Sequence, residues 1–142
     1  MIILDTNVIS ELTRAVPEPR VLSWLDSLPA EETAITAITA AELRYGVRRL
    51  PAGRRKNELS EAVRALITAD FHGRVEPFDV LAADQYADVV AERERTGRPI
   101  STSDAQIAAI CRVLGATLAT RSTSDFTSTG VTLIDPWEPV AD

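Results

Sequence analysis

Short runs of apolar residues alternate along this chain with longer segments in which apolar residues recur at helical spacing. The short runs predict strands at residues 2–4, 33–36, 75–78, 117–119 and 131–134. The longer segments predict helices at residues 8–12, 21–28, 39–50, 59–67, 80–96 and 103–114. Because strands that alternate with helices build parallel sheets covered on both faces, we predict a three-layer α/β/α fold with a mainly parallel central sheet. No linker divides the chain, so the prediction is a single domain over residues 1–142.

Four carboxylates stand where an apolar strand meets a loop or the start of a helix: Asp5, Glu42, Asp104 and Asp125. If the strands are parallel, their carboxyl ends share one edge of the sheet, where open α/β sheets bind ligands. We therefore expect the four acids to converge. Converging carboxylates repel one another unless a cation neutralises them, and sites made of oxygen ligands suit Mg²⁺ or Mn²⁺.

Each acid also has a purely structural interpretation. Asp5 can cap the first helix, and Glu42 can complete a capping box with Thr39; Ser103 and Gln106 have the same spacing. Asp104 lies in a first helical turn, where the helix dipole favours any acid, and Asp125 can be an ordinary turn residue. Taken singly these interpretations are the more common ones. Taken together they require four acids to reach one sheet edge by accident.

Composition limits the other possibilities. Cys111 is the only cysteine and His72 the only histidine, which excludes a disulfide, a cysteine-based zinc cluster and a ribonuclease that works through two histidines. No phosphate-binding glycine loop and no nucleophile elbow occur. No signal peptide or membrane span is visible, so we expect a cytoplasmic protein without membrane contact.

Net charge is −6, which by itself argues against a polyanionic partner. The basic residues are unevenly spread, however, with six between Arg44 and Lys56. A solvated helix face explains that run as well as phosphate binding does. If the run binds nucleic acid, Arg44, Arg48 and Arg49 are the candidates for backbone contacts. The acids themselves point to hydrolysis of a phosphodiester assisted by a metal ion, with hydroxyl and amide side chains orienting carboxylates or water: Thr6, Asn7, Thr120 and Ser122.

The chain resembles the PIN-domain ribonucleases, and among them the VapC and FitB-like toxins of bacterial type II toxin–antitoxin systems. The resemblance spans nearly the full length and lies in these stretches: 4–8, 38–43 with Gly46, 97–100, 104–109, 118–121, 125–126 and 135–137. It implies that Asp5, Glu42, Asp104 and Asp125 hold one or two Mg²⁺ or Mn²⁺ ions, with Thr120 beside them. It further implies RNA cleavage by metal-activated water, a homodimer, a neutralising antitoxin, and operator DNA bound through the antitoxin complex. Ser122 departs from the pattern, since many relatives have Asn there.

Two other functions remain open from the sequence. The domain can serve mainly as half of a DNA-binding, self-repressing complex with its antitoxin, with little nuclease activity. It can also be a phosphoryl-accepting receiver or a phosphatase, since those proteins place acids at strand ends too. Both usually need a lysine near the phosphate, and the only lysine, Lys56, lies in a predicted helix away from any strand end.

Overall fold

The computed structural model describes residues 1–139 and places five strands in one sheet, in the order β3-β2-β1-β4-β5. Every neighbouring pair of strands is parallel. The strands are β1 (Ile2–Leu4), β2 (Thr33–Thr36), β3 (Val75–Glu76), β4 (Thr117–Ala119) and β5 (Leu133–Ile134). The predicted α/β fold with a parallel sheet is confirmed. The predicted domain extends to residue 142, and residues 140–142 lie outside the described part.

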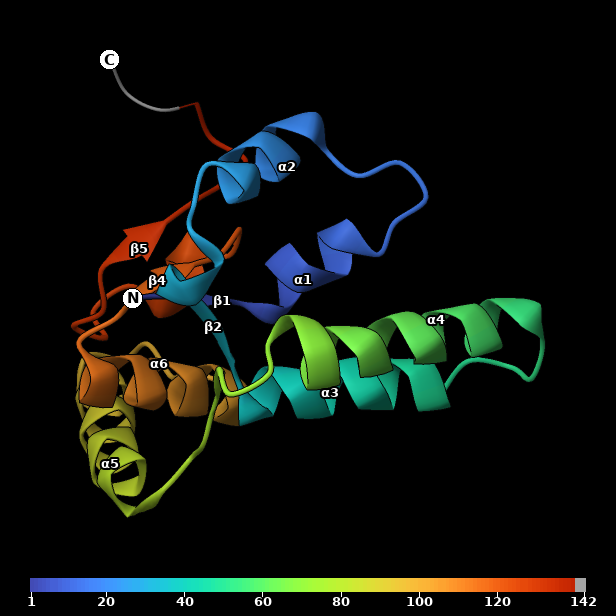
Figure 1. Cartoon of the computed structure of the whole chain (residues 1–142). Helices are drawn as coiled ribbons and strands as arrows, with labels where there is room; N and C mark the ends of the chain where they lie inside the picture. The colour runs from blue at the N-terminus through green and yellow to red at the C-terminus, as the bar shows by residue number, and fades with distance from the viewer. Residues whose placement is uncertain (140–142) are drawn as a thin grey trace.

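Helices cover both faces of the sheet (Figure 1). They are α1 (Thr6–Leu12), α2 (Pro19–Asp26), α3 (Ala37–Arg48), α4 (Arg54–Ala65), α5 (Val80–Arg95) and α6 (Thr102–Leu114). Two short 3-10 helices, η1 (Ala30–Glu32) and η3 (Thr123–Phe126), and a π-helical turn, η2 (Leu66–Asp70), complete the described elements. The helix predicted at residues 59–67 begins earlier, at Arg54, and ends in η2. The strand predicted at residues 75–78 stops at Glu76, because Pro77 has no N–H to donate.

Alternation of side chains along the strands divides the core into two layers. One layer packs against α5 and α6 and includes Ile3, Ala34 and Leu118; the other packs against α1 to α4 and includes Leu4, Ile35 and Ala119. Cys111 is buried in the first layer, and burial raises the pKa of its thiol to about 12. The thiol therefore stays protonated and unreactive at neutral pH.

Both predicted capping boxes are wrong. Helix α3 begins at Ala37, and its N-cap is Thr36, whose hydroxyl accepts the Thr39 N–H at 3.1 Å. Helix α6 begins at Thr102, and its N-cap is Ser101, whose hydroxyl accepts the Asp104 N–H at 3.3 Å. Each stretch holds more than one hydroxyl residue able to cap a helix. Which of them does so depends on where the chain leaves the preceding element, and local spacing does not determine that point.

Strand β1 lies at the centre of the sheet, between β2 and β4. The chain runs from β1 outward to β2 and β3 on one side, then crosses to β4 and β5 on the other. The order of the strands therefore reverses next to β1, and open α/β sheets form a ligand crevice at the carboxyl ends of the strands at such a point. None of the helices within residues 1–139 combines the length and the apolar character needed to cross a membrane.

Candidate active site

Asp5 and Thr120 follow the adjacent strands β1 and β4. The Asp5 N–H donates to the Ala119 carbonyl at 2.9 Å and extends the pairing of the two strands by one residue. The Thr120 hydroxyl donates to Asp5 Oδ2 at 2.7 Å, and the Thr6 N–H donates to Asp5 Oδ1 at 2.8 Å. Both carboxylate oxygens of Asp5 are thus held by the fold. Asp5 is at once the N-cap of α1 and a member of the site, so the two interpretations do not compete.

Asn7 joins α1 to the loop after β4. Its amide nitrogen donates to the hydroxyls of Thr120 and Ser122 at 3.3 and 3.2 Å, and its carbonyl oxygen accepts the Arg121 N–H at 3.3 Å. The Ser122 N–H also donates to the Thr120 hydroxyl, at 3.0 Å. Ser122 is therefore long enough to reach Asn7, and the loop keeps its connection to the site despite the departure from the family pattern.

Glu42 is held by a chain of hydroxyl groups. Thr6 donates to Glu42 Oε1 at 2.8 Å, and the hydroxyls of Thr6 and Thr39 lie 3.0 Å apart. Because Thr6 has a single hydroxyl hydrogen and gives it to Glu42, Thr39 is the donor in the second bond. Thr39 and Glu42 thus act on the site through Thr6, whereas the sequence had suggested that they cap a helix together.

Asp104 and Asp125, from the C-terminal part of the chain, complete the set of four acids. Asp104 lies in the first turn of α6 and is half-buried, and Asp125 lies in η3 and is exposed. Asp5, Glu42, Asp104 and Asp125 all line one cavity of about 540 Å³, together with Thr6, Asn7 and Ser122. The expected convergence at the sheet edge therefore occurs. Thr120 contributes from behind, through Asp5.

The pKa values of Asp5 and Asp104 are raised above the ordinary value of an aspartate. Burial is the main cause for Asp5, opposed by the hydrogen bonds from Thr120 and Thr6 and reinforced by the charges of Glu42 and Asp125. Burial is also the main cause for Asp104, opposed by a hydrogen bond with Ser101 and reinforced by Asp5 and Asp125. Among residues 1–139, none of the four acids forms an ion pair with a lysine, arginine or histidine. The cavity is therefore a concentration of negative charge that attracts a cation.

The donor set fits a small divalent ion. The four side chains offer hard oxygen ligands, and the charge of Asp5 contributes to the raised pKa of Asp104. Within residues 1–139, the side chains are not placed so that three or more Asp, Glu, Cys or His residues could ligate one metal ion together. Mg²⁺ is usually held by one or two carboxylates and keeps several waters, so it does not require a cage of three.

Comparison with known proteins identifies the family. The profile of the PIN domain matches residues 2–130. The chain belongs to the PIN-domain family. Over 139 residues this PIN domain is 43% identical to the VapC ribonuclease Y4jK of Sinorhizobium fredii, which covers 98% of this chain and 99% of that protein. It is 44% identical to the toxin FitB of Neisseria gonorrhoeae over 137 residues, covering 96% of this chain and 99% of the toxin.

A solved structure of FitAB bound to the IR36 DNA fragment has the same fold. It superposes with a TM-score of 0.94 at 42% sequence identity and covers 99% of both chains. Along nearly its whole length, this PIN domain is therefore similar in sequence to a VapC ribonuclease and to the toxin FitB, and in fold to a chain of FitAB.

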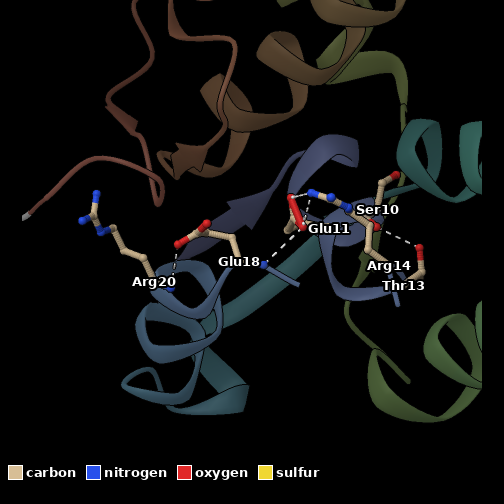
Figure 2. Close-up of polar contacts among 6 residues, drawn as sticks. All are labelled: Ser10, Glu11, Thr13, Arg14, Glu18 and Arg20. Atoms are coloured by element: carbon tan, nitrogen blue, oxygen red, sulfur yellow. Dashed lines mark hydrogen bonds and ion pairs between the residues drawn. The ribbon is translucent and has the colours of Figure 1, made fainter. Parts of the chain in front are cut away.

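A fifth carboxylate of the cavity was missed by the sequence analysis. Glu11 of α1 is only 4% exposed and lines the same cavity as the four acids. Its carboxylate accepts from the Arg14 guanidinium at 3.0 and 3.1 Å and from the Glu18 N–H at 3.3 Å, contacts that are drawn as dashed lines in Figure 2. Glu11 is thus neutralised by Arg14 and ties the loop before α2 to α1. Its spacing of three residues from Val8, on the buried side of α1, was the available sequence signal.

Arg93 was missed as well. Its side chain on α5 is only 4% exposed and donates to three backbone carbonyls: Arg98 at 2.6 Å, Asp125 at 2.9 Å and Thr127 at 2.9 Å. Two of these carbonyls belong to Asp125 and the residue that follows η3. Arg93 therefore positions the segment that carries Asp125. Nothing in the local sequence separates it from the exposed Arg95.

Proposed function

We propose that this PIN domain is a Mg²⁺- or Mn²⁺-dependent endoribonuclease that acts as a toxin and hydrolyses RNA phosphodiester bonds with an activated water molecule. The observation that supports it is the gathering of Asp5, Glu42, Asp104 and Asp125 around one cavity, where none of the four forms an ion pair within residues 1–139. The names of its relatives, a VapC ribonuclease and the toxin FitB, agree with this activity.

In this proposal Asp5 and Asp104 are the principal metal ligands, Glu42 binds or orients the ion or its water, and Asp125 completes the site. One or two bound ions would lower the pKa of a water molecule and offset the negative charge that builds on the phosphate. The residues of the chain supply the rest. Thr120 and Thr6 orient the carboxylates of Asp5 and Glu42, and Asn7 with Ser122 holds the loop beside them.

The test is cleavage of total bacterial RNA by the purified protein, with Mg²⁺ or Mn²⁺ and with chelator, followed by sequencing of the new 5′ ends. Asp104→Asn should abolish cleavage while the protein stays folded. Asp84→Asn is the matched control, because Asp84 is an exposed acid on α5 that does not line the cavity, and it should leave cleavage unchanged. Discrete ends that appear without metal, or from Asp104→Asn, would contradict the proposal.

We further propose that a small antitoxin neutralises this protein, that the complex binds operator DNA, and that the protein is a homodimer. FitB is called a toxin, and FitAB has been solved with a DNA fragment bound. Three measurements test these proposals: co-purification with any small protein whose gene adjoins that of this chain, light scattering of the purified protein, and binding of the complex to the DNA upstream of the gene. If Asp104→Asn inhibits growth as strongly as the unaltered protein, the DNA-binding complex is the main function and the nuclease is not.

A further inference from the structure

Arg121 and Trp137 form a cation–π pair at the cavity. The guanidinium carbon of Arg121 lies 5.1 Å from the centroid of the Trp137 ring. Both residues line the cavity that holds the four acids. Arg121 lies in the loop after β4, and Trp137 lies in the segment after β5. Both segments leave the sheet at the carboxyl ends of their strands.

The pair is attached to the site on both sides. The Arg121 N–H donates to Asn7 Oδ1 at 3.3 Å, so its backbone moves with the residues around Asp5. The Trp137 N–H donates to Asp135 Oδ1 at 2.9 Å, and the Trp137 carbonyl accepts from Arg20 at 2.8 Å. The indole also packs partly against the core layer beneath α1 to α4. Trp137 is therefore a fixed ring with one part in the core and another part at the cavity.

Arg121 differs from the other arginine of the cavity. Arg14 is neutralised by Glu11, whereas Arg121 is exposed and forms no ion pair within residues 1–139, although it borders four acids. A guanidinium held over an aromatic ring by a cation–π contact keeps N–H groups along its edge, and these can bind phosphate oxygens. An RNA strand that enters an acidic cavity needs such a cation for the phosphates next to the one being cleaved.

We propose that Arg121 and Trp137 form the binding platform for the RNA strand beside the scissile phosphate. Arg121 binds a neighbouring phosphate, and Trp137 stacks a base. This inference rests on the proposed nuclease function, because it assigns a place to that enzyme's substrate. Stacking accepts any base, so the platform binds single-stranded RNA and positions it without selecting a sequence.

Salt dependence of binding tests Arg121. A short single-stranded oligoribonucleotide of mixed sequence is titrated in chelator, so that no cleavage occurs. Arg121→Gln should weaken binding and reduce the slope of log K against log salt by about 0.7, the value for one phosphate contact to a single strand. Arg95→Gln is the control, because Arg95 is exposed on α5 and paired with Glu92, away from the cavity, and should keep the slope. An unchanged slope for Arg121→Gln overturns the assignment.

Tryptophan fluorescence tests Trp137 directly. The chain has two tryptophans, so Trp24→Phe leaves Trp137 as the only one. Its emission should be quenched when the oligoribonucleotide binds, whereas Trp137→Phe, which keeps Trp24, should show little change. Trp137→Ala should weaken binding about fivefold or more, the effect of losing one stacked base. Emission of Trp137 that does not respond to saturating oligoribonucleotide overturns the platform.

Cleavage kinetics separate the platform from the nuclease itself. In the metal-loaded enzyme, Arg121→Gln should raise KM more than it lowers kcat, and Arg121→Lys should recover the salt slope. If the unaltered protein cuts no RNA but its binding depends on Arg121 and Trp137, the nuclease fails and the platform stands. If the unaltered protein cuts RNA, Arg121→Gln and Trp137→Ala leave KM and the salt slope unchanged, and Trp137 fluorescence does not respond to RNA, the platform fails and the nuclease stands.

Discussion

The hydroxyl of Thr120 donates a hydrogen bond of 2.7 Å to the carboxylate of Asp5, a residue 115 positions earlier in the chain. Both side chains are buried, with Thr120 fully so and Asp5 only 6% exposed. The same hydroxyl accepts from the Asn7 amide and from the Ser122 N–H. One oxygen atom therefore joins β1, β4, α1 and the loop that leads to Asp125.

Thr120→Val should disturb both stability and the site. Valine keeps the shape of threonine but leaves the Ser122 N–H and one oxygen of Asp5 without a partner, which costs about 1–3 kcal/mol of unfolding free energy. The hydrogen bond from Thr120 lowers the pKa of Asp5, so its loss should move the cleavage optimum to higher pH. Urea unfolding and a pH–rate profile measure the two effects. Thr120→Ser retains the hydroxyl and should restore both.

Asp104→Asn should stabilise the metal-free protein at neutral pH. Burial, with the charges of Asp5 and Asp125, holds the pKa of Asp104 above its ordinary value of 3.8, so its ionisation costs the folded state free energy. The stability that its protonated form contributes is complete below pH 3.8 and is lost as pH rises through the raised pKa. Asparagine should raise the free energy of unfolding by less than about 1 kcal/mol, because Asp104 is partly exposed and water screens its charge.

Unfolding midpoints of Asp104→Asn and the unaltered protein, measured in chelator across pH, check this sign. The two curves should separate at neutral pH and converge on acidification. If the difference between the two unfolding midpoints grew as the pH fell, the pKa of Asp104 would not be raised in the folded protein. Saturating Mg²⁺ should reverse the order at neutral pH, because the ion stabilises only the protein whose site binds it.

Arg93→Met should destabilise far more than Arg95→Met, although the two arginines are two positions apart on α5. Removing Arg93 leaves three backbone carbonyls without their donor, at a cost of about 2–4 kcal/mol. Arg95 is 71% exposed and paired only with Glu92, so its replacement should change stability by no more than about 0.5 kcal/mol. Urea unfolding compares them. Equal losses would show that the Arg93 contacts to the η3 segment contribute little.

Glu11→Ala should lower the free energy of unfolding by about 1–3 kcal/mol, because it removes the buried carboxylate that accepts from the Glu18 N–H and from Arg14. Glu58→Ala is the matched control. Glu58 also pairs with an arginine on its own helix, but both side chains are exposed, and such pairs contribute between 0 and about 1 kcal/mol. Thermal unfolding of both variants checks the contrast, and Glu11→Gln, which keeps one acceptor, should lie between them.

The sequence alone determined the sheet and the acids at its edge. Buried parallel strands appear as short continuous apolar runs, so the strands at residues 2–4, 33–36 and 117–119 were predicted at their observed bounds. Asp5 follows the first of these runs directly. Once the strands are parallel, the residues that follow them share one edge, and this accounts for the place of Asp5. Glu42, Asp104 and Asp125 lie in α3, α6 and η3, so the packing of those helices on the sheet brings them to the same edge.

The tertiary structure decided the contacts that cross between distant segments. In the folded protein, Thr36 and Ser101 are the N-caps of α3 and α6, whereas the sequence favoured Thr39 and Ser103. The tertiary structure also buries Arg93 against η3 and places the Arg121 guanidinium over the Trp137 ring. Periodicity records which face of a helix is apolar, but a polar residue is buried only when a partner from another segment satisfies its hydrogen bonds. That partner is fixed by how the segments pack in three dimensions, and no local pattern along the chain contains it.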